Sequence, residues 1–274
     1  MCLRPCHQAG DVFYCVVMCS ELFDLSGRTA LITGGGRGIG LAIAEGLAEH
    51  GADVALLART AEQLDKACAK IRADTGRKAL SLPYNLEDIE GIGGLFEDVV
   101  EQAGAVDILV NCAGTTARGA SEDVNMADWE RVQTVNLKSV LVLSQAFCRH
   151  RKQAGAGGSI VNIGSLMCAG ARPTTAAYAA SKGGLLMLTK TLAVEWAKYG
   201  INVNAIGPGY IATDLTAPLR ADEEFSKWVL SKTPAGRWGK PEDLVGAAVL
   251  LASPAGAFIT GQIIYVDGGW LALL

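Results

Sequence analysis

The chain of 274 residues lacks a strong charge of either sign and lacks any long apolar run. Its formal net charge is −4, so it offers no basic footprint of the kind that indicates a nucleic-acid partner. No apolar run approaches the roughly 18 residues that a membrane-spanning helix needs. These absences argue against nucleic-acid binding and membrane insertion, and we expect a cytoplasmic protein.

The sequence also lacks a low-complexity linker and any sign of a second domain. Half of the residues are hydrophobic and only 19% are charged, as expected for a parallel sheet that is buried on both faces. A mass of 28.6 kDa fits one α/β domain with a substantial core. We therefore predict a single domain over residues 21–274, with a doubly wound parallel sheet and helices on both of its faces.

The chain lacks cysteine pairs in a sequence context that is typical of a metal site. Four cysteines are scattered along the chain and fit a reduced interior, namely Cys68, Cys112, Cys148 and Cys168. Four more crowd the first twenty residues together with His7, namely Cys2, Cys6, Cys15 and Cys19. Zinc is conceivable there, but these C-x3-C pairs lack a matching folded knuckle. We predict no metal site, and we interpret residues 1–20 as a disordered leader or an overlong start.

What the chain does have is a glycine-rich turn between a strand-like and a helix-like segment. The β-branched run Thr29–Thr33 precedes the loop Gly34–Gly40, and Leu41–Glu49 has helical spacing of apolar residues. Glycines let the backbone approach a pyrophosphate, which then rests on the N–H groups of the helix start. The spacing Gly34-x3-Gly38-x-Gly40 thus predicts a dinucleotide site, and the alternative is a glycine loop without a ligand.

The next strand-like run, Asp53–Leu57, is followed by Ala58 and Arg59. An acidic residue at this point usually binds the ribose 2′-hydroxyl of NAD. Arg59, with Arg37 from the glycine loop, favours the 2′-phosphate of NADP instead. NAD stays possible, because both arginines can equally be solvated surface charges.

Tyr178 and Lys182 lie four residues apart in a predicted helix over 175–198, so they share one face. A fixed ammonium beside a phenol stabilises the phenolate, which is then able to act as a proton acceptor. Ser165 follows the apolar run Ser159–Ile163 and supplies a hydroxyl to hold a substrate oxygen. A single Tyr-x-x-x-Lys also occurs by chance, so the pair gains weight only from the rest of the chain.

The glycine loop, Ser165, Tyr178 and Lys182 occur in the order that is typical of the short-chain dehydrogenase/reductase family, and the chain resembles this family from about residue 25 onward. Further segments that match are Asn111-Cys112-Ala113-Gly114, Asn136 within Thr134–Leu137, Pro208-Gly209, and Tyr265-Val266-Asp267-Gly268-Gly269. The resemblance implies a Rossmann fold and reversible hydride transfer between a nicotinamide and a secondary alcohol or ketone. It also implies a homotetramer.

Residue roles also follow from the resemblance. The implied catalytic residues are Asn136, Ser165, Tyr178 and Lys182, with Asn136 holding a water that links Lys182 to solvent. The implied cofactor-binding residues are Gly34, Gly36, Arg37, Gly38, Ile39, Gly40, Arg59, Asn85, Asn111, Ala113, Gly114, Tyr178, Lys182, Pro208, Gly209, Ile211 and Thr213. Two positions depart from the family pattern. Cys112 replaces an asparagine, and Asn85 replaces an aspartate near the adenine.

Within the family, the chain is most similar to gluconate 5-dehydrogenase-like members, through segments such as 22–27, 136–140, 234–239 and 244–248. Three segments that follow strands are candidates for the substrate pocket, namely 115–121, 166–174 and 210–228, the last as a lid. Arg118 and Arg172 can clamp a carboxylate, which suits a sugar acid. The remaining candidate substrate contacts are Met167, Ser165 and Tyr178.

Two other functions stay open at this stage. One is a 3-oxoacyl-carrier-protein reductase, which shares several of these segments. The other is a non-catalytic dinucleotide sensor, which the presence of all four catalytic residues argues against. The apolar tail Trp270–Leu274 adds to the expectation of an assembly, because an exposed apolar chain end indicates an interface.

Overall fold

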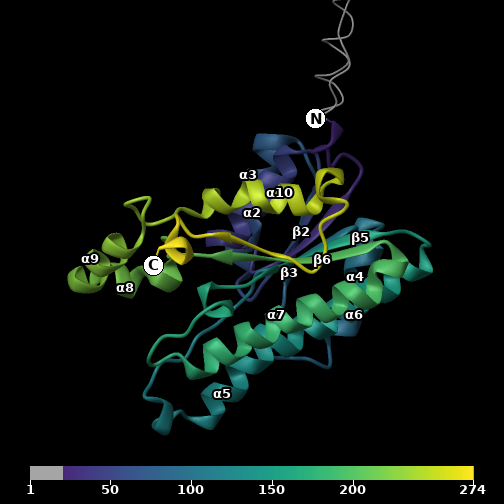
Figure 1. The fold of residues 1–274 in the computed structure, drawn as a ribbon. Helices are drawn as coiled ribbons and strands as arrows, with labels where there is room; N and C mark the ends of the chain where they lie inside the picture. Colours follow the sequence, from purple (N-terminus) through teal and green to yellow (C-terminus); the bar gives the residue numbers. More distant parts are fainter. Residues whose placement is uncertain (1–20, 274) are drawn as a thin grey trace, which may run out of the picture.

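Seven parallel strands form one sheet in the computed structural model, which describes residues 21–273 (Figure 1). The strands are β1 Thr29–Thr33, β2 Asp53–Ala58, β3 Ala79–Pro83, β4 Ile108–Asn111, β5 Gly158–Ile163, β6 Ile201–Pro208 and β7 Ile263–Val266. Their order is β3-β2-β1-β4-β5-β6-β7. The predicted Rossmann-type parallel sheet is therefore confirmed. The predicted leader, with its four cysteines and His7, lies outside the described residues.

Helices cover both faces of the sheet, so the strands are buried on both sides. In β1, Ala30 and Ile32 belong to one apolar cluster, while Leu31 belongs to the other. The first cluster is covered by α2 Gly38–Glu49, α3 Ala61–Thr75 and α10 Val245–Ala252. The second is covered by α4 Ile92–Ala103, α6 Ser139–Gln153 and α7 Ala176–Trp196 (Figure 1). Among the helices that the structure describes, none combines the length and apolarity needed to cross a bilayer.

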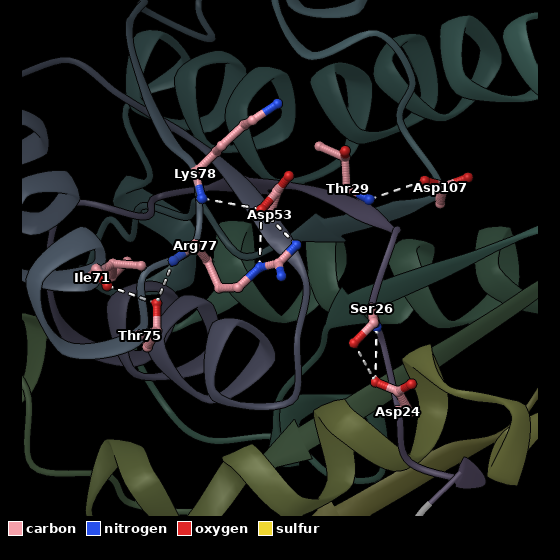
Figure 2. Close-up of polar contacts among 9 residues, drawn as sticks. All are labelled: Asp24, Ser26, Thr29, Asp53, Ile71, Thr75, Arg77, Lys78 and Asp107. Carbon is pink, nitrogen blue, oxygen red and sulfur yellow. Dashed lines mark hydrogen bonds and ion pairs between the residues drawn. The ribbon is translucent and has the colours of Figure 1, made fainter.

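Polar contacts close the amino ends of the strands, at the edge opposite the site (Figure 2). The backbone N–H of Thr29 donates to the carboxylate of Asp107 at 2.9 Å. The carboxylate of Asp53 accepts from the backbone N–H of Lys78 and from Nε of Arg77, each at 3.0 Å. These carboxylates satisfy backbone groups where the strands begin.

The segment after β6 departs from the sheet and forms short helices beyond its edge (Figure 1). It contains the 3-10 turn η5 Asp214–Thr216 and the helices α8 Ala217–Ala221 and α9 Glu223–Lys232. Asp222 caps α9 by accepting from the N–H of Phe225 at 3.0 Å, which satisfies a donor that the first helical turn leaves free. We call residues 210–232 the lid segment. The remaining helix, α5 Met126–Gln133, precedes α6.

Candidate active site

A cleft of about 660 Å³ opens at the carboxyl ends of the strands, where the strand order turns from β1 to β4. Such a switch point is where open α/β sheets bind ligands. The glycine loop lines one end of the cleft, and Ser165, Tyr178 and Lys182 line the other. The structure therefore brings together the two motifs that are separated by more than a hundred residues in sequence.

The glycine loop has a backbone that other residues would strain or block. Gly34 and Gly38 have φ angles of +71° and +57°, in the region that favours glycine. A Cβ atom on Gly40 would lie 2.3 Å from the carbonyl oxygen of Gly34. Arg37 precedes α2 without a side-chain cap, so the first N–H groups of the helix remain available to an anion.

A threonine hydroxyl joins the ends of β1 and β4 beneath this loop. The Oγ1 atom of Thr33 accepts hydrogen bonds from the backbone N–H groups of Cys112 and Ala113 at 2.9 and 3.0 Å. The contact places Ala113 against the glycine loop, where a Cβ atom on Gly34 would lie 3.1 Å from Ala113 Cα. Sequence reasoning did not assign Thr33 a role, although its position at the strand end was a signal. Burial raises the pKa of the Cys112 thiol to about 12, so this thiol stays neutral in the cleft wall.

Ser165, Tyr178 and Lys182 come from two elements that meet at the cleft. Ser165 follows β5 and begins the 3-10 turn η3 Leu166–Cys168, where its Oγ accepts from the N–H of Met167 at 3.2 Å. Tyr178 lies in the first turn of α7. Lys182 lies one turn later, and its Nζ is 5.7 Å from the centroid of the tyrosine ring. The buried ammonium donates to the carbonyl of Ile163 at 2.7 Å, which fixes the cation behind the phenol.

Asn136 lies next to this group but not on the cleft surface. It belongs to a π-helical turn, η2 Thr134–Lys138, a type of irregularity that is frequent at functional sites. Its amide nitrogen donates to the carbonyl of Thr115 at 2.9 Å and to Oγ of Ser181 at 3.0 Å. Its amide oxygen accepts from the N–H of Thr115 at 2.8 Å. Asn136 thus holds Thr115, which lines the cleft.

Asn111 was predicted to contact the cofactor, and the structure buries its side chain beneath the cleft. Its amide nitrogen donates to Oδ1 of Asn162 at 2.9 Å and to Oγ of Ser144 at 3.4 Å. Asn162 in turn donates to the hydroxyl of Thr189 at 2.9 Å. This buried polar chain ties β4 and β5 to α6 and α7, so the structure places Asn111 as a support of the cleft wall.

The two arginines predicted to read the 2′-phosphate are placed differently. Arg59 lines the cleft at the end of β2 and, within residues 21–273, enters no ion pair. Arg37 also lines the cleft, but its Nη1 pairs with the carboxylate of Asp214 at 2.9 Å. This pair joins the glycine loop to the lid segment. The other predicted cofactor contacts that line the cleft are Gly36, Ile39, Asn85, Gly114, Pro208, Gly209, Ile211 and Thr213.

The candidate substrate residues Arg118, Met167 and Arg172 do not line this cleft. Arg172 instead donates from Nη1 to the hydroxyl of Tyr210 at 2.8 Å, beside Gly209 at the cleft wall. Tyr210 lies in the segment 210–228 that was predicted to form a lid, but no role was predicted for the residue itself. Within the described part of the chain, no cluster of three His, Cys, Asp or Glu residues is arranged to hold a metal ion.

Comparison with known proteins gives the family. A family model described as enoyl-(acyl carrier protein) reductase matches residues 34–271. Gluconate 5-dehydrogenase of Gluconobacter oxydans (strain 621H) is 44% identical over 253 residues, which are 91% of this chain and 96% of the relative. For 2-dehydro-3-deoxy-D-gluconate 5-dehydrogenase of Dickeya dadantii (strain 3937), the identity is 44% over 257 residues, which are 93% and 100% of the two chains.

A solved structure agrees with these relatives. The crystal structure of a gluconate 5-dehydrogenase from Burkholderia cenocepacia J2315, in complex with NADP and tartrate, has a TM-score of 0.89 at 41% identity. The match covers 93% of this chain and 100% of that one. With a cleft of this geometry and matches over most of its length, the chain belongs to the short-chain dehydrogenase/reductase family.

Proposed function

We propose that the protein is an NADP-dependent oxidoreductase that interconverts a secondary alcohol and a ketone on a sugar acid. The observation that carries the proposal is the single cleft with the glycine loop at one end and Ser165, Tyr178 and Lys182 at the other. The two relatives described above are named for gluconate and for 2-dehydro-3-deoxy-D-gluconate, which supports the substrate class.

The residues present fit a dinucleotide. The glycine loop turns tightly at Gly34 and Gly38, which have positive φ angles, and the uncapped start of α2 offers N–H groups to a pyrophosphate. The nicotinamide end would be held by Pro208 and Gly209, together with the ammonium of Lys182. NADP, when bound, supplies the hydride acceptor or donor of the reaction.

The remaining chemistry belongs to the side chains. During oxidation, Tyr178 accepts the proton of the substrate hydroxyl, and the fixed cation of Lys182 stabilises the phenolate that this requires. The hydroxyl of Ser165 donates to the substrate oxygen and orients it. Asn136 holds Thr115 and Ser181 in place, and its role in holding a water beside Lys182 stays a prediction.

The preference for NADP over NAD rests on the end of β2. Ala58 stands where an NAD site usually has a carboxylate, and Arg59 lines the cleft beside it. A guanidinium at this place attracts the 2′-phosphate, whereas nothing there accepts a hydrogen bond from a free 2′-hydroxyl in the way an acid does. The Burkholderia relative, whose structure contains NADP, supports this choice.

The experiment that tests the proposal is a substrate panel on the purified full-length chain, with NADP and NAD each supplied. The panel contains D-gluconate, the uncharged polyol sorbitol and, in the reductive direction, an acetoacetyl thioester. We expect turnover of the sugar acid with NADP. Turnover of the thioester alone would favour a 3-oxoacyl reductase, and cofactor binding without any turnover would favour a dinucleotide sensor.

The proposal includes a homotetramer. Several apolar side chains are exposed on a single chain, among them Met187 and Val194 on α7 and Leu271 and Leu273 in the tail. Exposed apolar patches of this kind indicate interfaces. Light scattering checks the state, and a monomer would contradict it. Deletion of residues 270–274 tests whether the tail takes part in assembly. A shift to dimers supports this role, and an intact tetramer excludes it.

A further inference from the structure

The guanidinium of Arg172 contacts three aromatic residues of the lid segment. Its Nη1 donates to the hydroxyl of Tyr210 at 2.8 Å. Its Cζ lies 4.6 Å from the ring centroid of Phe225 and 4.8 Å from that of Trp228. An arginine stacked in this way loses the freedom of its long side chain before any ligand arrives.

The partner that orients Arg172 is neutral. Burial raises the pKa of the Tyr210 phenol above its usual range, and the nearby charges of Arg172 and Arg118 oppose this only in part. A carboxylate in the same place would neutralise the guanidinium, whereas a phenol fixes its direction and leaves its charge available. Within residues 21–273, neither Arg172 nor Arg118 forms an ion pair with an acid, although eight other contacts of this kind occur.

The loops that carry the two arginines are joined to each other. The carbonyl of Thr174 accepts from the N–H of Gly119 at 3.3 Å. Thr174 has a φ of +67°, which is strained for a β-branched residue and persists only where the surrounding structure imposes it. The connection brings the segment of Arg118 beside the segment of Arg172, and both charges act on the Tyr210 hydroxyl.

Tyr210 itself is fixed by four aromatic rings, two from α9 and one each from Trp238 and Trp270. Its ring centroid lies 5.8 Å from Phe225, 6.2 Å from Trp228, 5.6 Å from Trp238 and 4.9 Å from Trp270. The chain has few aromatic residues, only 6% of its composition, and five of them gather here. Tyr210 also follows Gly209 and precedes Ile211, both of which line the cleft.

We infer that Tyr210 is a positioning residue for substrate recognition: its hydroxyl, with the rings of Phe225 and Trp228, presents the charged guanidinium of Arg172 to a carboxylate of the substrate. The inference rests on the proposed sugar-acid function and deepens it. Recognition of the carboxylate then depends on the position of the lid segment, because the rings that hold Arg172 belong to this segment.

The test is the substitution Tyr210→Phe in the full-length protein with NADP present. It keeps the ring cluster and removes only the hydroxyl. The KM for D-gluconate should rise by about tenfold, the worth of one hydrogen bond, while kcat stays unchanged. Tyr199→Phe, in the 3-10 turn that follows α7, is the matched control and should leave both constants unaltered.

The role of Arg172 is tested by combining the change with Arg172→Gln. If Tyr210 acts through Arg172, the second substitution removes the effect of the first, and the double variant matches Arg172→Gln alone. An undiminished effect in the Arg172→Gln background would overturn the inference. So would an unchanged KM in Tyr210→Phe, or a loss confined to kcat.

Calorimetry keeps this test separate from that of the overall function. If the wild-type protein fails to oxidise D-gluconate, the proposed function fails, and titration of the NADP-loaded protein with D-gluconate and with tartrate still measures the site. Binding that is weakened alike by Tyr210→Phe and Arg172→Gln supports the site. Absence of carboxylate binding by the wild-type protein defeats it.

Discussion

The cofactor end and the lid end of the cleft are held together by different kinds of contact. The cofactor end consists of tightly turned glycines and buried polar contacts, such as Thr33 with Ala113. The lid end consists of aromatic rings and exposed charges contributed by segments far apart in sequence. The first end has little room to move, since a single Cβ atom on Gly40 would collide with backbone. The lid end is held by contacts between side chains, and each of these side chains can be replaced by another residue.

This difference indicates a division of labour. A rigid cofactor end suits a dinucleotide whose shape is the same for every turnover. An exchangeable lid end suits the recognition of a substrate, and the relatives are named for different sugar acids. The chemistry belongs to Ser165, Tyr178 and Lys182, which line the same cleft.

The largest effect is expected at the residue that transfers the proton. Tyr178→Phe keeps the ring and removes the ionisable hydroxyl, so turnover should fall by about 10²-fold or more. Binding of NADP, measured by titration, should change little because the cofactor end is untouched. Turnover at the wild-type level would contradict the assignment of Tyr178 as the proton acceptor.

The substitution Gly40→Ala disturbs the backbone of the cofactor end most directly. The added Cβ atom would lie 2.3 Å from the carbonyl oxygen of Gly34, so the loop must shift. We expect a loss of about 3 kcal/mol in the free energy of unfolding and weaker NADP binding. Gly94→Ala in α4 is the control, because a Cβ atom there meets nothing within 4 Å, and it should be neutral or slightly stabilising. Unchanged stability and NADP binding in Gly40→Ala would show that the loop is not rigid.

The same contrast decides how much could be predicted from the sequence. The strand at Thr29–Thr33 and the glycine loop are local patterns, and the structure places them as expected. The helix with Tyr178 and Lys182 was also predicted, although it ends as an α-helix at Trp196 and continues to Tyr199 as a 3-10 turn. Spacing along one strand or helix carries this information.

Contacts between residues far apart in the sequence could not be predicted from the spacing along one strand or helix. The pairing of Arg37 with Asp214 spans 177 residues, and that of Arg172 with Tyr210 spans 38. The tail was expected to form an interface, with folding back onto its own subunit as the alternative. Trp270 packs on Tyr210 and Trp228 of the same chain, whereas Leu271 and Leu273 are exposed. Such contacts depend on where the lid segment turns back, and no local periodicity encodes that turn.

The cofactor preference is a finer test of the cofactor end. Arg59→Asp replaces an attractive charge at the end of β2 with a repulsive one. The ratio of kcat/KM for NADP over NAD should fall by about tenfold or more. Arg59→Gln, which removes the attraction without adding repulsion, should give an intermediate ratio. An unchanged ratio in Arg59→Asp would show that this arginine does not read the 2′-phosphate.

The lid end contains an ion pair whose effect depends on pH. Arg237 and the backbone N–H of Lys240 lower the pKa of Asp243 to about 2. Because the folded pKa is depressed, the stabilisation is present above the unfolded value of 3.8 and disappears as the pH falls through about 2. Asp243→Asn should lower the free energy of unfolding by about 1 kcal/mol at pH 7, a value already reduced for the exposure of the pair. The difference from wild type in thermal melts should shrink as the pH falls from 3.8 toward about 2 and vanish below that, and a constant difference at every pH would contradict this account.

The smallest effect is expected at the ion pair between Arg37 and Asp214, which joins the two ends. Arg37 and Asp214 are 60% and 71% exposed, so their attraction is weak and is screened by salt. Asp214→Asn releases Arg37 toward the cleft, and NADP affinity should rise by about threefold or less, with the gain shrinking at high salt. Asp214→Glu keeps the charge and should behave as wild type. A gain of tenfold or more would make the pair a gate between lid and cofactor, and weaker NADP binding would mean that Asp214 holds Arg37 ready for the phosphate. Either result would replace the division into two separate ends with a coupled site, in which seating of the lid and binding of the cofactor depend on each other.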